Sequence, residues 1–170
     1  TTSTITLVDG LSANGTFTNS TGTFSLGSQS FSITGLFTNN GTIRLAGSNI
    51  ITLSAGNDID SGTWEYFGNG TGSSVNHTIQ DFGTNDYYNL IINDVSASNS
   101  DTFQLGGNLK VAGTLTITDG TFNGTSLTVD VDGSIAIAAA GAFTSTSGVL
   151  SLGGNFTNAG TFSHNNGGII

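Results

Sequence analysis

The heptad FTNNGTI, residues 37–43, returns as FTNAGTF at residues 156–162. The two copies keep an apolar residue at each end and a glycine at the fifth position, which are Phe37, Gly41 and Ile43 in the first and Phe156, Gly160 and Phe162 in the second. We expect Phe37 and Ile43 to point into a core, while Asn39, Asn40 and Gly41 turn the corner between two strands. Because Ala159 replaces Asn40, the motif looks like an instruction for folding and not a ligand site.

A longer repeat surrounds the heptad. Triplets of glycine, a small residue and an apolar residue begin at 22, 41 and 62 and again at 113, 133 and 154, in nearly even steps. A second series begins at 15, 35, 120, 141 and 160. Two interleaved series with a period of about twenty residues predict at least two strands per unit.

Within each unit, polar and apolar residues alternate, as in TLTIT at 114–118, SLTVDV at 126–131 and SIAI at 134–137. This period of two is typical of strands with one face on a core. Asn-Gly and Asp-Gly dipeptides, which favour tight turns, separate the strands. No segment has the pattern of a helix.

These patterns predict an all-β fold: a β-solenoid, similar to a parallel β-helix, with about 20 residues per coil. A β-sandwich is the alternative, because its strands also recur every eight to twelve residues or so. The return of Phe and Ile at one phase favours the solenoid, since stacked coils place equivalent residues in ladders. With about six coils between them, the two heptads would lie on the same edge of the stack.

We expect residues 1–170 to form a single solenoid-like domain with an irregular insertion at about 65–101, where the repeat breaks down. The strand patterns at both ends carry no evident cap, and natural solenoids cap their exposed edges. The chain therefore reads as a segment of a longer repeat array or as a filament subunit.

The insertion and its edge contain the only Trp and all three Tyr of the chain. The candidate binding residues are Trp64, Tyr66, Phe82, Tyr87 and Tyr88. One interpretation is an aromatic surface for a sugar or a protein partner, because Trp and Tyr are favoured at contact hot spots. The other is that these rings pack over one face of the solenoid or cap its core.

The charge of the chain excludes some partners. Its net charge is −9, with eleven acidic residues against Arg44 and Lys110, so no basic patch is available for nucleic acid or for an anionic membrane. No apolar run approaches the roughly 18 to 20 residues of a membrane span. So few Lys and Arg residues leave trypsin-like proteases little to cleave, which favours an extracellular or cell-surface location.

The inventory of catalytic residues is small: no Cys, one Lys, one Glu and two His that belong to no recognisable motif. We therefore predict that the protein is not an enzyme and needs no cofactor. Two acidic pairs could hold calcium, Asp58 with Asp60 and Asp130 with Asp132. Ordinary turn residues are the alternative interpretation of both pairs.

Three blocks resemble the repeats of very large secreted surface proteins of bacteria and archaea: YYNLIIND at 87–94, LGGNLKVAGTLTITDGTFNG at 105–124 and LGGNFTNAGTFSHNNGG at 152–168. Those are adhesin-like or filament-forming chains, broadly similar to the filamentous-haemagglutinin type of β-solenoid. The resemblance implies an extracellular structural role as a filament subunit, matrix component or adhesin stalk. Its partners would be further copies joined end to end or flanking repeats of the same chain, with glycans as an alternative.

A third functional hypothesis comes from pairs of threonines two residues apart. They lie at 4/6, 16/18, 21/23, 114/116, 116/118 and 144/146. Stacked on one flat face, such pairs could order water and bind ice. The alternative is that β-branched Thr simply fills the exposed faces of strands.

Overall fold

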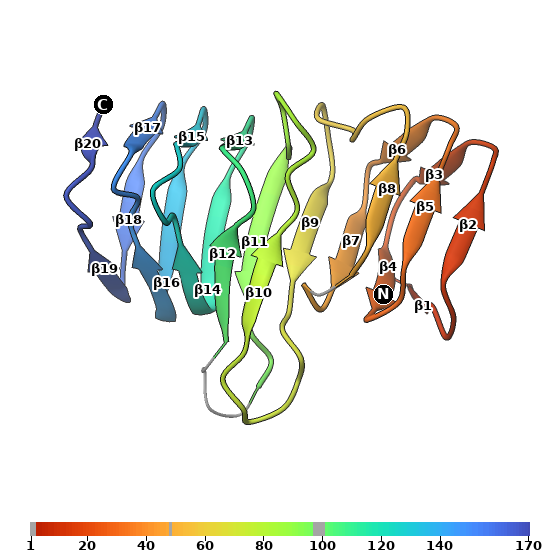
Figure 1. The fold of residues 1–170 in the computed structure, drawn as a ribbon, viewed down its shortest axis with the longest axis horizontal. Helices are drawn as coiled ribbons and strands as arrows, with labels where there is room; N and C mark the ends of the chain where they lie inside the picture. Colours follow the sequence, from red (N-terminus) through yellow and green to blue (C-terminus); the bar gives the residue numbers. More distant parts are fainter. Residues whose placement is uncertain (1–2, 48, 97–100) are drawn as a thin grey trace.

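The chain winds into an all-β solenoid of about 8 turns with roughly 20 residues per coil, and its strands pair in parallel (Figure 1). The structure is a computed structural model that describes residues 3–47, 49–96 and 101–170. The coils follow one another along the long axis, and the two termini lie at opposite ends. The predicted solenoid is therefore confirmed, and the alternative of a β-sandwich is wrong.

The strands are short, as expected for coils that turn every few residues. In chain order they are β1 (Thr4–Thr6), β2 (Leu11–Ala13), β3 (Phe17–Asn19), β4 (Thr23–Gly27), β5 (Phe31–Ile33), β6 (Phe37–Asn39), β7 (Thr42–Leu45), β8 (Ile51–Leu53), β9 (Thr63–Tyr66), β10 (Asn76–Ile79), β11 (Asn89–Asn93), β12 (Thr102–Leu105), β13 (Leu109–Val111), β14 (Leu115–Asn123), β15 (Val129–Val131), β16 (Ile135–Thr144), β17 (Val149–Leu152), β18 (Phe156–Asn158), β19 (Thr161–Ser163) and β20 (Gly168–Ile169).

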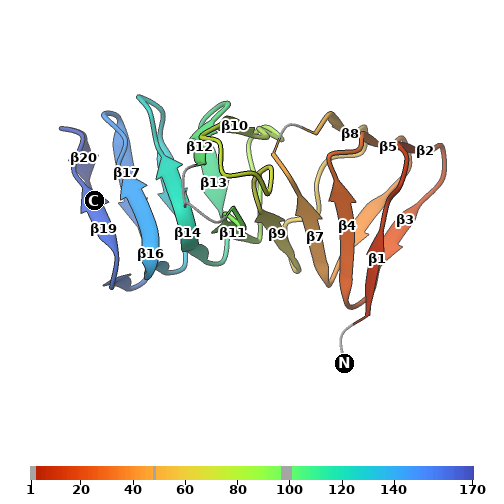
Figure 2. The same ribbon diagram turned by 90° about the horizontal axis from the view of Figure 1, so that it is seen from below.

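Each coil has up to three sides, seen in two views in Figures 1 and 2. Side A runs the length of the stack through β1, β4, β7, β9, β11, the first halves of β14 and β16, and β18. Side B follows it along the chain, as β2-β5-β8 in the N-terminal half and as β10, β12, the second halves of β14 and β16, and β19 in the C-terminal half. Side C is β3-β6 and then β13-β15-β17-β20.

Apolar side chains stack in register on the inside of side A. Successive rungs of this ladder are Ile5, Phe24, Ile43, Trp64, Leu90, Leu115, Ile135 and Phe156. The five rungs from Ile43 to Ile135 are fully buried or nearly so. Burying each such side chain stabilises the fold by about 1.5 to 3 kcal/mol, so the ladder is a main source of stability.

The structure also explains the residues of the heptad. Phe37 and Ile43 are buried, as predicted. A Cβ on Gly41 would lie 2.5 Å from the carbonyl oxygen of Gly22, so the backbone of the preceding coil leaves room for glycine only. Asn39 was predicted to turn the corner, but it is the last residue of β6 and is buried, with 1% of its surface exposed.

The two heptads lie at different corners, so the prediction that they share one edge is wrong. In the first, FTN forms β6 on side C and the chain then turns to side A. In the second, FTN forms β18 on side A and the chain then turns to side B. Both heptads therefore encode the same strand-corner-strand unit, but the second lies one side further along its coil than the first. We call this shift of the heptad the phase slip.

Two central coils of the solenoid are longer than the others. In an ordinary coil Thr4 pairs with Thr23, whereas in the central coils Thr63 pairs with Asn89 and Leu90 pairs with Leu115, so each central coil is several residues longer. The extra residues lie in the region predicted as an insertion at about 65–101, of which 97–100 fall outside the described residues. This region is part of the stack, because it contains β10, β11 and the end of β9. The described part of the chain contains no helix that is long and apolar enough to span a membrane.

Candidate functional site

The aromatic residues predicted as a binding surface lie mainly inside the solenoid. Trp64, Tyr66 and Tyr87 have at most 1% of their surface exposed, and Phe82 is half-buried against them. Of the five residues only Tyr88 is exposed, with 36% of its surface accessible to solvent. The rings therefore belong to the core, as the packing interpretation expected. Trp64 and Tyr66 point inward from β9 as rungs of the side A ladders, and Tyr87 and Phe82 pack against Trp64.

Two of these rings form a buried polar pair. The hydroxyls of Tyr66 and Tyr87 lie 2.8 Å apart, the N–H of Gln80 donates to Tyr66, and Tyr87 donates to the carbonyl of Gln80 at 2.6 Å. Burial raises the pKa of Tyr66 to about 12 and raises the pKa of Tyr87 well above its usual value. Both phenols therefore stay protonated, and they hold residue 80 to the core.

The acidic pair Asp130 and Asp132 already has a cation beside it. The ammonium of Lys110 lies 2.8 Å from Asp130 and 2.6 Å from Asp132. These hydrogen bonds raise the pKa of Lys110 above its usual value, so the charge is held there at neutral pH. The calcium hypothesis thus meets a competing positive charge at this pair.

The other acidic pair has a structural partner. Asp58 accepts hydrogen bonds from the N–H of Asn39 at 2.7 Å and from the N–H of Asp60 at 3.2 Å. Asp60 is exposed and accepts from Ser61 at 3.0 Å. In the described residues no three His, Asp or Glu side chains gather in a way that could hold a metal ion. This geometry fits the alternative interpretation of turn residues.

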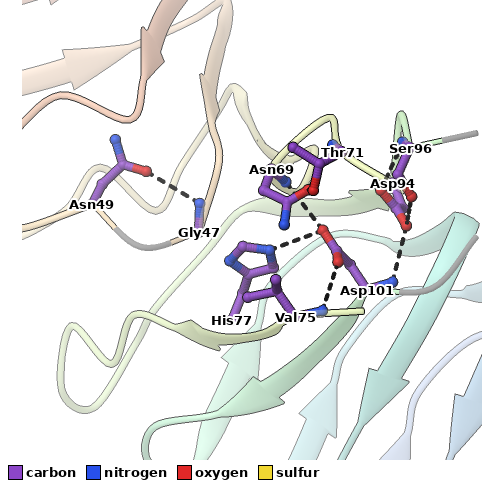
Figure 3. Close-up of polar contacts among 9 residues, drawn as sticks. All are labelled: Gly47, Asn49, Asn69, Thr71, Val75, His77, Asp94, Ser96 and Asp101. Atoms are coloured by element: carbon purple, nitrogen blue, oxygen red, sulfur yellow. Dashed lines mark hydrogen bonds and ion pairs between the residues drawn. The ribbon is translucent and has the colours of Figure 1, made fainter. Parts of the chain in front are cut away.

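The most concentrated polar centre surrounds Asp101, a residue that carries no sequence motif (Figure 3). Asp101 is completely buried and directly precedes β12. Its carboxylate accepts hydrogen bonds from the N–H of Asn69 at 3.0 Å, from the N–H of Val75 at 2.9 Å and from Nε2 of His77 at 3.0 Å. Asn69 and Val75 lie near the two ends of the loop between β9 and β10, and His77 lies on β10, so this one carboxylate holds the loop against the next coil.

The ionised form of Asp101 is favoured. Burial alone would raise the pKa of this carboxyl, but the three hydrogen bonds outweigh burial and hold the pKa below its usual value. Because an ionised carboxylate only accepts, Nε2 of His77 must carry the hydrogen. His77 is itself 3% exposed and stacks on Phe103, with ring centroids 5.1 Å apart.

A second buried carboxylate extends this centre. Asp94 directly follows β11 and accepts from the N–H of Asp101 at 3.0 Å and from the hydroxyl of Ser96 at 2.7 Å. The backbone at Gly68 has a φ of +78°, and a Cβ there would lie 2.5 Å from Asp101 and 2.7 Å from Asp94. Glycine is therefore required where the loop passes over the two carboxylates.

A groove of about 410 Å³ lies beside this centre, along β10. It is lined by Gly47, Asn49, Asn69, Val75, Asn76, His77, Thr78 and Gln80, which include four amide side chains and no Asp, Glu, Lys or Arg. The strand β10 ends its branch of the sheet and pairs with β12. The groove therefore follows a sheet edge in the middle of the molecule.

The Asp101–His77 pair resembles part of a catalytic dyad, so the surroundings of the second ring nitrogen of His77 need to be described. In a catalytic dyad the second ring nitrogen faces a nucleophile. Here Nδ1 of His77 is buried without a hydrogen-bond partner among the described residues, and a Cβ on Gly47 would lie 3.1 Å from it. The pair thus holds a loop in place, and the groove beside it offers hydrogen-bonding groups.

The threonine pairs do not make one continuous face. The pair at 4/6 and the triplet at 114–118 belong to side A, whereas 16/18 and 144/146 belong to sides C and B. In register from Thr6, the outward rank of side A reads Thr6, Ser25, Arg44, Glu65, Ile91, Thr116, Ala136 and Thr157. An ion pair between Arg44 and Glu65, at 3.3 Å, interrupts this rank.

No protein-family model matches the chain, and no curated protein or solved structure matches it either. The resemblance to secreted surface proteins therefore rests on the three repeat blocks alone. The extracellular location, the partners and the absence of an enzymatic activity stay predictions.

Proposed function

We propose that this chain is an extracellular structural protein that acts through its stack of coils, as a filament subunit, a matrix component or an adhesin stalk. It would perform no reaction and would need no cofactor. The low content of Lys and Arg supports the extracellular location, because it leaves few sites for trypsin-like proteases.

The observation that carries the proposal is that the first and last coils have unpaired strand edges and exposed apolar side chains. At one end β1 pairs with β4 on a single edge, and at the other β18, β19 and β20 pair only with the preceding coil. Ile5 is 63% exposed, Phe156 41% and Ile169 56%, although each continues an internal apolar ladder. Unpaired strand edges with apolar side chains are templates for further pairing. Another coil of the same kind, from a second copy or from flanking repeats, would complete both.

Electron microscopy of the purified protein over a range of concentrations tests this proposal, together with light scattering to measure mass. We expect fibres whose length per subunit is about 38 Å, from about 8 coils at roughly 4.8 Å each. A monodisperse monomer at every concentration, with no fibres, would contradict end-to-end assembly.

A second candidate function is glycan binding in the groove along β10. Amide side chains offer both donors and acceptors to sugar hydroxyls, and the lining carries no Asp, Glu, Lys or Arg, which suits a neutral ligand. This site replaces the predicted aromatic surface, since truncating the buried Trp64 would damage the core.

A glycan screen of three proteins tests this candidate. We expect the wild type to give a sugar-dependent signal that Asn76→Ala removes and that the control Asn85→Ala retains. Both side chains are exposed, and only Asn76 lines the groove. No signal with the wild type would end this candidate without affecting the structural proposal.

A further inference from the structure

Side B is most regular in the C-terminal half of the stack. There β10, β12, the second halves of β14 and β16, and β19 pair in parallel, and no shift of register interrupts them. Side A differs, because its pairing shifts register after Ile92 and again after Ile117. The five regular rungs of side B span about 19 Å, from four strand spacings of roughly 4.8 Å.

One inward position of these five strands carries an aromatic ring on every rung. In register the rings are His77, Phe103, Phe122, Phe143 and Phe162. The ring centroids of Phe122 and Phe143 are 5.0 Å apart, and those of Phe143 and Phe162 are 5.4 Å apart. Sheets normally twist, and a ladder of stacked side chains is one of the features that hold a sheet flat. The outer surface of side B therefore has a regular support.

The outward residues of the same strands form two ranks along the axis. The first rank consists of Asn76, Thr102, Thr121, Ala142 and Thr161. All five are half-buried or exposed, three of them carry a hydroxyl, and none is charged or aromatic.

The second rank lies two residues further along each strand, about 6.4 to 6.8 Å from the first. It consists of Thr78, Gln104, Asn123, Thr144 and Ser163. Each of these side chains ends in a hydroxyl or an amide, and each is half-buried or exposed. We call the ten residues of both ranks the side B face.

A regular and uncharged face suits a ligand that is itself periodic and neutral. Hydroxyls and amides recur on it at about 4.8 Å along the axis and at about 6.4 to 6.8 Å across it. The oxygen atoms of an ice surface recur at distances close to both spacings. Charged side chains would keep their own hydration shells, as the ion pair of Arg44 and Glu65 does on side A, whereas the side B face carries none. A sugar would gain less, because the face has no aromatic ring on which it could stack.

The side B face begins at the groove along β10, since Asn76 and Thr78 line the groove and start the two ranks. In the groove wall His77 is 3% exposed, and its Nε2 is bonded to Asp101. Nδ1 is therefore an acceptor, is turned toward Gly47 in Figure 3 and has no donor among the described residues. Buried acceptors of this kind are commonly satisfied by ordered water, which the polar walls of the groove can hold. The groove thus supports ordered water beside the first rung.

We propose that the side B face binds ice, by fixing water molecules on its two ranks. This function goes beyond the structural role proposed above and does not depend on it, because one chain carries the whole face. Of the predicted threonine pairs only Thr144 belongs to the face. The register of the strands, and not the spacing of threonines in the sequence, identifies it.

Thermal hysteresis, the gap between the melting and freezing temperatures of an ice crystal in the protein solution, tests the proposal. The variant Thr121→Lys places a charge on the middle rung of the first rank. The matched control is Thr116→Lys, because Thr116 lies on the same strand and is also half-buried, but points outward from side A. Circular dichroism checks that both variants keep their strand content.

We expect hysteresis with the wild type and with Thr116→Lys, and its loss with Thr121→Lys. We also expect an increase with Ala142→Thr, which adds the missing hydroxyl between Thr121 and Thr161. Hysteresis that survives Thr121→Lys would overturn the assignment to the side B face. No hysteresis with the wild type, together with its exclusion from slowly grown ice, would overturn ice binding altogether and leave the structural function untouched.

Discussion

Asp101 allows the sharpest test of what holds the central coils together. Replacing it with asparagine keeps the shape of the side chain but removes the charge and turns one acceptor into a donor. The carboxylate accepts three hydrogen bonds of 2.9 to 3.0 Å, from Asn69, Val75 and His77. Hydrogen bonds to charged groups contribute about 1.5 to 3 kcal/mol each, against about 1 kcal/mol for neutral ones. Each of the three bonds therefore loses about 0.5 to 2 kcal/mol, and the summed loss for Asp101→Asn is ~1.5 to 6 kcal/mol, a large share of the roughly 5 to 15 kcal/mol typical of a domain.

Urea unfolding followed by the fluorescence of Trp64 measures this loss. Trp64 is the only tryptophan and is buried in one of the two long coils, so its emission reports the region around Asp101. The control is Asp60→Asn, which neutralises an exposed carboxyl and should change the free energy of unfolding by no more than about 0.5 kcal/mol.

The pH dependence supplies the refutation. The pKa of Asp101 is lowered in the folded protein, so its stabilisation is complete above the unfolded pKa of about 3.9 and disappears as the pH falls through the folded value. The difference between wild type and Asp101→Asn should be full at neutral pH and shrink only in acid. A difference below about 1 kcal/mol, or one that stays constant into acid, would mean that the charge does not anchor the loop.

Three further substitutions test other contacts. Gly62→Ala would place a Cβ 2.1 Å from a backbone oxygen of the preceding coil at a φ of +72°, so we expect the free energy of unfolding in urea to fall by ~3 kcal/mol or more. The control Gly56→Ala, which has a φ of +90° but open space around it, should lower this free energy by only ~1 to 2 kcal/mol. Lys110→Met should lower the free energy of unfolding by no more than about 1 kcal/mol, because the ion pairs of Lys110 are partly exposed. The melting temperature of this variant should rise with added calcium, whereas that of the wild type should not. Tyr66→Phe should cost about 1 to 3 kcal/mol, since the N–H of residue 80 loses its acceptor, whereas Tyr88→Phe at the surface should leave the urea midpoint unchanged.

The local elements of the fold follow from the sequence. Alternation in TLTIT predicts the first half of β14, and the glycine of the heptad marks a corner because Gly41 and Gly160 each lie against the backbone of the preceding coil. The aromatic residues of the central region could not be assigned in the same way. Trp64 and Tyr66 alternate with polar neighbours in both interpretations, and only their register with Ile43 and Leu45 shows that they continue a buried ladder.

The phase slip and the Asp101 centre could not be predicted, for related reasons. A heptad that turns one corner of a triangular coil turns any other equally well, so the motif carries no information about the side. Asp101 meets Asn69, Val75 and His77 across long stretches of chain, with no repeat to align them. The sequence marks this centre only indirectly: the repeat breaks down at about 65–101, the region that contains these buried polar groups.

These two unpredicted features have a common physical cause. Apolar rungs are interchangeable, as side A shows by stacking Ile, Trp and Leu in succession, so hydrophobic burial alone is nearly indifferent to which strand of the repeat enters which side. Hydrogen bonds to Asp94 and Asp101 are directional, and a carboxylate left unpaired inside the stack would cost several kcal/mol. We therefore infer that the hydrogen bonds of Asp94 and Asp101 fix how the long central coils stack, which apolar burial alone leaves open.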